Sequence, residues 1–404
     1  MSFQQALSGL NAASRSLDVI GHNIANAGTT GMKASRAEFA EIYASSAGSV
    51  GGTSVGLGVS VGAVTQQFSQ GGLNITGNDL DVAINGAGFF QVRGTDGTTA
   101  YSRAGNFKLD KDGSIITNTG AQLMGYPTDA AGVRQSFDAQ ALKLPTGAPI
   151  AAKQTTQMNA EITLDASAAV AASATPPTPL TTYGTSLTAY DPQGLEIPVG
   201  LYFTKTANNT WNVHTSVNGS NPAASTPFTL TFLPNGTLDP SSTIPPITLA
   251  SPNDPAQTFT ANLDLSRMTQ VNARFAVSDL SQDGYTAGQL TGIKIENSGV
   301  VTATYSNGQT QAAGQLALVN FRNTQGLAPS GSGYWVETFA SGQPVRGAPG
   351  EGTFGQLRAG ALEDSNVDLT AELVNMMTTQ RAYQANAQTI KTQDQVMSTL
   401  VNLR

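Results

Sequence analysis

The two ends of this 404-residue chain follow a helical pattern that the residues between them do not share. Residues 3–27 contain no proline, and residues 368–402 contain neither proline nor glycine. The apolar residues of the first stretch recur at steps of three, four and seven: Phe3, Leu7, Leu10, Leu17 and Ile24. Those of the second stretch do so too: Leu369, Leu373, Met376, Tyr383, Ile390, Met397 and Leu400. Such steps place side chains on one helix face, so we expect an α-helix at each end.

The residues between the two ends show the patterns of β-strands and turns. An Asp-Gly pair, Asp112-Gly113, stands between two short apolar stretches. This arrangement is a strong signal for a β-hairpin. Alternating apolar residues return at 290–340. We therefore expect residues 70–145 and 285–357 to form one discontinuous β domain.

Residues 146–284 differ from their surroundings in composition. They are rich in Thr, Ala, Asn and Pro, and short strand-like stretches recur at 183–190, 198–205, 210–217 and 227–233. Short strands separated by turns are typical of antiparallel β domains. The segment predicts an inserted β sandwich or barrel.

The predicted fold is α+β and mainly β, with one β domain nested inside another and both terminal helices outside them. The segment that follows the first helix is rich in Gly, Ser and Ala, which fits either a flexible linker or an extended packed segment. The expected divisions are terminal helices at 1–27 and 366–404, linkers at 28–69 and 358–365, a middle β domain at 70–145 and 285–357, and an outer β domain at 146–284.

Composition excludes several classes of function. The absence of cysteine excludes disulfide scaffolds, thiolate zinc sites and cysteine nucleophiles, and two histidines leave little for metal or general-base chemistry. A formal charge of −7 lacks the basic surface of a nucleic-acid binder. The sequence has no apolar run of the ~20 residues that a membrane span needs, and its start lacks the pattern of a cleaved signal peptide. We expect no catalytic, cofactor-binding or metal site, no nucleic-acid partner and no membrane insertion.

The two apolar stripes indicate assembly. Each lies at a chain end, far in sequence from any other predicted helix, and a single helix of this kind is marginal in water. Small residues such as Gly9, Ala12 and Ala382 permit close helix–helix approach. We expect the helices to pair with each other and with neighbouring subunits as a coiled coil. The twelve stripe residues named above are the candidate assembly interface.

Several motifs resemble those of one family. Residues 17–33, LDVIGHNIANAGTTGMK, resemble the N-terminal signature of bacterial flagellar rod, hook and hook-associated proteins. Residues 360–368, GALEDSNVD, with 380–384, QRAYQ, resemble the C-terminal signature. Residues 76–90 and 101–107 are similar to the shared β domain.

The resemblance implies a structural subunit of the flagellum. Within the family, the length and the insert favour the hook subunit, which polymerises into a curved, flexible tube that transmits torque from rod to filament and encloses the export channel. The implied location is the extracellular flagellum, reached without a cleaved signal peptide. The implied partners are many copies of the chain itself, the distal rod protein, the hook cap protein, the hook–filament junction protein and the flagellar type III export apparatus.

Two alternatives remain open at this point. One is the flagellar distal rod subunit, which forms a straight tube and lacks a sizeable insert. The other belongs to a different class, a secreted β-rich carbohydrate-binding or hydrolytic protein. That protein needs paired carboxylates in a cleft or an aromatic platform. Its candidate residues are Asp191, Glu196, Tyr202 and Trp211.

Overall fold

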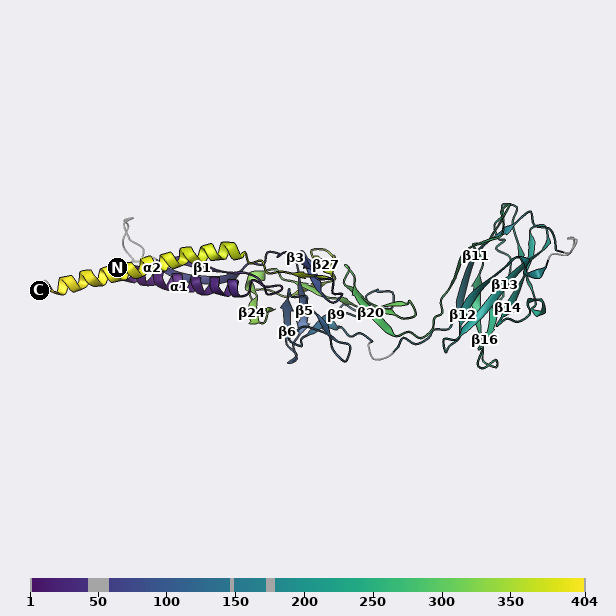
Figure 1. Ribbon diagram of the computed structural model, residues 1–404, viewed down its shortest axis with the longest axis horizontal. Coiled ribbons are helices and arrows are strands. Elements are labelled where there is room, and N and C mark those ends of the chain that lie inside the picture. The colour runs from purple at the N-terminus through teal and green to yellow at the C-terminus, as the bar shows by residue number, and fades with distance from the viewer. Residues whose placement is uncertain (1, 43–57, 146–148, 172–178, 403–404) are drawn as a thin grey trace. The chain divides into compact units, whose positions relative to one another are not determined.

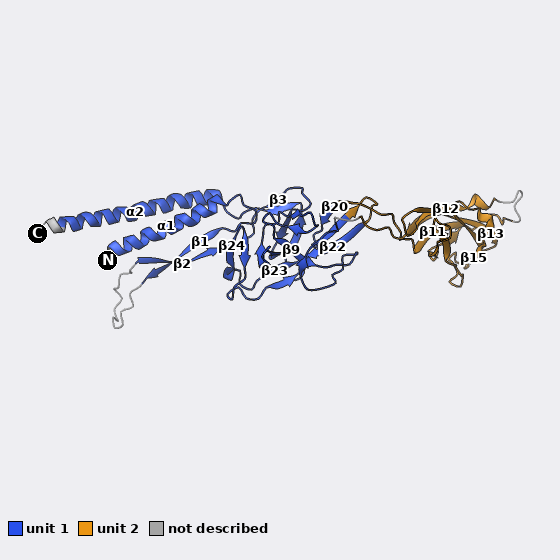
Figure 2. Cartoon of the chain, turned by 90° about the horizontal axis from the view of Figure 1, so that it is seen from below, with its two compact units in different colours: residues 1–147, 292–303, 310–404 blue, residues 148–291, 304–309 orange. Residues whose placement is uncertain are grey.

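The computed structural model describes residues 2–42, 58–145, 149–171 and 179–402. The chain divides into two compact units (Figure 2). Unit 1 comprises Met1–Gly147, Gly292–Ala303 and Thr310–Arg404, and unit 2 comprises Ala148–Thr291 and Thr304–Gln309. The domain boundaries expected from the sequence stay a prediction, including the break at 284 and the break at 146, which lies outside the described residues.

Helices occupy both ends of unit 1, as the stripes predicted. α1 spans Ser2–Ala25 and α2 spans Leu369–Asn402, and the two lie side by side (Figure 1). Asp368 caps α2, because its Oδ1 accepts hydrogen bonds from the backbone N of Thr370 at 2.9 Å and of Ala371 at 3.1 Å. Over its described residues, neither helix is long and apolar enough to cross a membrane.

A two-stranded hairpin follows α1 in the segment whose conformation the sequence left open. β1 (Ser35–Ile42) and β2 (Gly58–Gln66) pair antiparallel, with Ser35 opposite Gln66 and a bulge between Glu38 and Phe39. The described parts of 28–69 therefore include an extended, paired segment.

The rest of unit 1 is built from short strands around one large, mainly antiparallel sheet. Its longest path runs β20-β21-β22-β9-β5-β6-β25-β24, and the pairs β27–β4 and β28–β3 lie beside it. β7 and β8 form the hairpin that Asp112-Gly113 predicted, with Gly113 at φ 79°. The strand bounds are β3 Leu73–Ile75, β4 Val82–Asn85, β5 Phe89–Arg93, β6 Thr99–Ser102, β7 Lys108–Leu109, β8 Ile115–Ile116, β9 Gln122–Tyr126, β10 Gln140–Ala141, β20 Leu290–Ile295, β21 Val300–Tyr305, β22 Thr310–Leu316, β23 Leu318–Asn320, β24 Ala328–Gly331, β25 Tyr334–Val336, β26 Val345–Gly347, β27 Gln356–Ala359 and β28 Ala361–Glu363, with a 3-10 turn η3 at Thr324–Gly326.

Strand β5 separates two apolar clusters in unit 1. Successive side chains of a strand point to opposite faces of the sheet. Phe90 accordingly packs with aliphatic residues such as Val82 and Leu123, whereas Phe89 packs in an aromatic cluster with Tyr101 and Trp335. All six of these side chains are buried.

Unit 2 is a β sandwich, one of the two folds expected for the insert. One sheet has the order β16-β17-β11-β18 with β19 also on β11, and the other has the order β12-β13-β14-β15. A single core takes Met158 and Ile162 from the first sheet and Val199 and Trp211 from the second. The bounds are β11 Gln157–Asp165, β12 Gly184–Tyr190, β13 Glu196–Ala207, β14 Thr210–Val217, β15 Phe228–Thr231, β16 Ile247–Ala250, β17 Thr258–Asp264, β18 Thr269–Val271 and β19 Ala276–Gln282, with 3-10 turns η1 Leu180–Thr182 and η2 Pro222–Ala224.

Asp283 fixes the start of β11 within unit 2. Its carboxylate accepts hydrogen bonds from the backbone N of Thr156 at 2.7 Å and of Gln157 at 2.9 Å, and from Thr156 Oγ1 at 2.6 Å. Lys153 Nζ lies 3.1 Å away. Desolvation by burial raises the pKa of this carboxyl, but the hydrogen bonds and Lys153 outweigh it and hold the pKa of Asp283 well below its usual range.

Unit 2 is expected to lose stability in acid partly through Asp283. The pKa of Asp283 is lower in the folded state than its unfolded value of about 3.9. The ionised carboxylate therefore stabilises unit 2 fully when the pH is above the unfolded pKa, and this stabilisation is lost as the pH falls through the folded-state pKa. Asp283→Asn should cost about 1–2 kcal/mol near neutral pH. Urea unfolding, followed by Trp211 fluorescence in a Trp335→Phe background, measures this at neutral pH and in acid. The difference in free energy of unfolding between parent and variant should become smaller in acid. A difference that stays the same contradicts the prediction.

Candidate assembly interface

The two terminal helices form a regular antiparallel pair. At the end near the β domain, Asn23 Nδ2 donates to Glu372 Oε1 at 3.0 Å. Gly9, fourteen residues before Asn23 in α1, lies against Asn386, fourteen residues after Glu372 in α2. A Cβ added to Gly9 would come within 2.8 Å of Asn386 Nδ2. The glycine therefore permits close approach of the helices, and the N- and C-termini lie at the same end of the pair (Figures 1 and 2).

The β1–β2 hairpin holds α1 from another side. The buried carboxamide of Asn23 donates to the Ser35 carbonyl at 2.7 Å and accepts from the Ser35 backbone N at 2.8 Å. Ser8 Oγ accepts from the Val59 backbone N at 3.2 Å. α1 thus has polar anchors to the hairpin near both of its ends.

A buried charge cluster of Lys33, Arg103 and Glu363 joins the paired ends to the β domain. Lys33 Nζ lies 2.6 Å from Glu363 Oε1, and Arg103 Nη1 lies 3.2 Å from Glu363 Oε2. Lys33 also donates to the Ser69 carbonyl at 2.7 Å, and the Gly71 backbone N donates to Glu363 at 3.0 Å. One carboxylate therefore connects four stretches of chain.

Burial makes this cluster sensitive to the loss of any member. Both cations and the carboxylate are almost completely inaccessible to water. Desolvation lowers the pKa of Lys33, whereas its hydrogen bond and attraction to Glu363 oppose that change. A buried charge that loses its partner remains desolvated without compensation, so the cluster is stable only when it is complete.

Asn366 strengthens the same junction. Its Oδ1 accepts from the Ala34 backbone N at 2.7 Å, and its Nδ2 donates to the Gln67 carbonyl at 2.7 Å. The same Nδ2 lies 2.9 Å from Ser69 Oγ. Asn366, which lies just before α2, is thereby hydrogen-bonded to the residue before β1 and to the residue after β2.

The stripe residues predicted as an assembly interface fall into two groups. The side chains of Phe3, Leu7, Leu369, Leu373, Tyr383 and Met397 are each more than a third exposed. Those of Leu10, Leu17, Ile24, Met376 and Ile390 are partly buried, and the side chain of Leu400 lies outside the described residues. The apolar residues that α1 buries most fully are Ala6, Ala12, Ala13 and Ile20. Small residues thus mediate much of the contact within the chain and leave large ones facing outward; the assignment of the twelve residues to assembly stays a prediction.

The charge cluster was not anticipated from the sequence. Lys33 and Glu363 both fall within the quoted motifs, but 330 residues separate them, and no local pattern indicates that they meet. The one available signal is that charged residues make up only 12% of the chain, so each charge in an apolar setting stands out.

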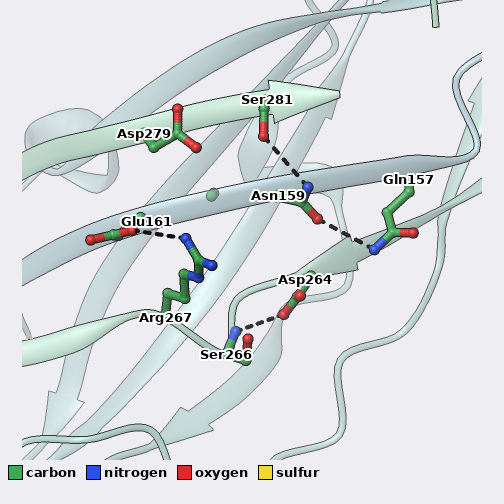
Figure 3. A pocket seen from close by; sticks show the side chains of 9 residues that line it. Gln157, Asn159, Glu161, Asp264, Ser266, Arg267, Asp279 and Ser281 are labelled. Carbon is green, nitrogen blue, oxygen red and sulfur yellow. Dashed lines mark hydrogen bonds and ion pairs between the residues drawn. The ribbon is translucent and has the colours of Figure 1, made fainter. Parts of the chain in front are cut away.

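A polar pocket of about 250 Å³ lies on the β11 sheet of unit 2 (Figure 3). Glu161 and Asp279 are cross-strand neighbours there, and Asp264 lies on the adjacent strand β17. Arg267 is paired with Glu161 at 3.7 Å, and the Glu161 side chain is 42% exposed. A general acid needs a carboxyl group whose protonated form is favoured by burial, which an exposed carboxylate beside a cation does not provide.

The four residues that the hydrolase or carbohydrate-binding alternative requires do not form a cleft. Asp191 is buried and accepts from Ser251 Oγ at 2.6 Å, and Trp211 is buried with its Nε1 donating to Gln270 at 3.2 Å. Glu196 is exposed and Tyr202 half-buried. Asp191 and Trp211 therefore serve the packing of unit 2.

Family models match along the chain. They are the Flagella basal body rod protein family at residues 3–33, the Flagellar hook protein FlgE/F/G D1 domain at 83–170, the Flagellar basal body protein FlaE D2 domain at 163–285 and the Flagellar basal body rod FlgEFG protein C-terminal family at 358–403.

Full-length relatives match as well. The flagellar hook protein FlgE of Salmonella typhimurium is 43% identical over 418 residues, covering 100% of both chains. That of Escherichia coli K12 is 42% identical with the same coverage, and that of Treponema pallidum is 31% identical, covering 100% of this chain and 99% of its own. The chain belongs to the flagellar hook protein family. The family resemblance seen in the terminal sequences is thereby confirmed.

The chain is a structural subunit of the bacterial flagellar hook, which belongs to the extracellular part of the flagellum. The full-length hook relatives favour the hook over the distal rod alternative. A crystal structure of Helicobacter pylori flagellar hook protein FlgE2 shares the fold, with a TM-score of 0.54, 15% identity and coverage of 72% of this chain and 100% of that chain.

Glu363→Gln is expected to destabilise the junction of the hook subunit by about 3–5 kcal/mol, because Lys33 and Arg103 then remain buried without a counter-charge. The matched control is Glu38→Gln, which removes the exposed pair with Arg36 and should cost less than about 1 kcal/mol. Hydrogen exchange of the backbone amides of residues 31–36 and 361–366 measures the loss of stability at the junction in both variants. Equal losses of protection in the two variants contradict the prediction.

Proposed function

We propose that the subunit polymerises through its paired terminal helices into a curved, flexible tube that encloses the export channel and transmits torque from rod to filament. The observation that carries this proposal is the exposure of large apolar residues on both helices, including Phe3, Leu7, Leu373 and Met397. A single chain buries its own helix contact with small residues and leaves these side chains in water.

Assembly then gains its free energy from this exposed surface. Burial of apolar area contributes about 25 cal/mol per Å². Because the outward-facing residues gain cover only when copies meet, the helical ends are completed by the polymer. We propose accordingly that the ends of a free subunit are less protected than the two β cores.

Low charge density suits a joint that bends. A bending tube changes the spacing between copies as it rotates, and displaced buried ion pairs would cost several kcal/mol each. Charged residues make up 12% of this chain. We place the hinges of the subunit near 28–69, the expected linker, and near 145–146 and 284–285, where the expected outer domain begins and ends.

The proposed partners are those of a hook between rod and filament. They are further copies of the chain, the distal rod protein, the hook cap protein and the hook–filament junction protein, with delivery by the flagellar type III export apparatus and without a cleaved signal peptide. The subunit acts through contacts and not through catalysis. Electron microscopy of polymers formed by the purified chain tests the proposal: curved tubes support it, and straight rods or the absence of polymer overturn it.

Leu373→Asp is expected to reduce polymerisation at least about tenfold, because assembly would then bury an unpaired carboxylate. Leu10→Asp should act in the same direction. Thr378→Asp is the matched control, since Thr378 is an exposed polar residue of the same helix. Sedimentation of polymer measures all three, and circular dichroism checks that the monomers are folded. Normal polymerisation of Leu373→Asp contradicts the helix-interface proposal.

Deletion of residues 146–284 should leave tube formation intact and change the curvature of the tube. The reason is that the expected outer domain contributes contacts between copies but contains none of the residues of the predicted helix interface. Electron micrographs of polymers from the parent and the deletion variant give the curvature directly. An unaltered curvature contradicts the prediction.

A further inference from the structure

The carboxyl-terminal end of α2 extends beyond α1. Asn23 faces Glu372 and Gly9 faces Asn386, so the first residue of α1, Ser2, falls level with residue 393 of α2. α2 continues to Asn402. Figure 1 shows this yellow end of α2 running past the N-terminus. Residues 394–402 are therefore helical without α1 alongside.

Two patches of exposed apolar side chains lie at opposite ends of α2. The tail patch consists of Val396 and Met397, and each side chain is about half exposed. The base patch consists of Leu369, Leu373, Val374 and Met377, which are exposed to a similar degree. Phe3 and Leu7, the exposed large residues of α1, lie at the tail end and not at the base. At the base end of the pair, the large exposed apolar side chains of the two helices belong to α2.

Met397 of the tail patch continues a row along α2. Met376 and Ile390 in this row are partly buried, and Tyr383 lies between them on the same seven-residue spacing. A row of this spacing packs against another helix. Since α1 of the same chain stops short of Met397, a helix that packs on the tail patch has to come from another copy.

We propose that the tail patch of one copy docks against the base patch of the next copy in the polymer, with the two α2 helices parallel. This inference rests on the proposed function. Among the described residues α1 and α2 are the only α-helices, and copies in a tube repeat one rotation and translation. A contact between one end of α2 and the opposite end of its parallel neighbour is heterologous and shifts each copy along the helix axis, so it repeats along the tube.

Engineered cysteines test this contact cleanly because the chain contains no cysteine. Leu373 and Met397 are 24 residues apart on one helix, a distance of about 36 Å at 1.5 Å per residue. A disulfide needs Cα atoms within about 7 Å. Any disulfide in a Leu373→Cys, Met397→Cys chain therefore joins two copies.

The matched control pair is Ala371→Cys with Gln395→Cys. These two exposed residues have the same separation but lie two residues away, about 200° around the helix. Both double variants are oxidised with copper–phenanthroline as assembled tubes and as dilute monomer, then separated on non-reducing gels. In tubes we expect a ladder of covalent oligomers from the 373/397 pair, on the order of tenfold more than from the control pair, and almost none in dilute monomer.

The outcomes separate this inference from the proposed function. Tubes without the ladder, or with equal ladders from both pairs, overturn the docking of tail on base and leave hook assembly intact. Failure of the unmodified chain to form tubes overturns both. If the 373/397 variant does not assemble, a photoreactive benzoylphenylalanine at Met397 replaces it. Cross-links to peptides within 366–380 of another copy then support the docking, and cross-links elsewhere overturn it.

Discussion

The ion pairs made by Glu363 determine how the two chain ends meet. This carboxylate receives Lys33 from the segment after α1 and Arg103 from the β domain, and it precedes α2 by only a few residues. With all three side chains out of water, the arrangement is favourable only when every partner is present. The cluster thus sets the base from which both helices leave the β domain, and Asn23 and Asn366 extend the same polar contacts to the hairpin.

This junction also brings together residues that lie far apart in the sequence. Lys33 and Glu363 are 330 residues apart, so the ion pair forms only after most of the chain is available. Closing so long a loop has an entropic cost that local contacts do not have. The core of unit 1 depends on comparably long separations, because β4 pairs with β27 and β3 pairs with β28, the strand that contains Glu363. The junction and the core of unit 1 therefore both require the two halves of the chain to meet.

The sequence predicted those features of the fold that depend on local pattern. The helices at both ends followed from apolar spacing, and the β7–β8 hairpin followed from Asp112-Gly113. Strand pairing across long separations did not follow, as in the parallel pairing of β11 with β17 and β18. The charge cluster was missed for the same reason, since a single charge carries no sign of its distant partner.

The stripes show why helix existence was easier to predict than helix partners. Spacing identifies a face but not what covers it, and alanine contributes little to an apolar pattern. Ala6, Ala12 and Ala13 are nevertheless among the most buried residues of α1, and Gly9 lies against Asn386 of α2, where an added Cβ would come too close. Large residues at such a contact would hold the helices apart. A chain that buries mainly small residues on α1 and leaves large ones exposed has a second helix surface, which we propose is covered by its neighbours.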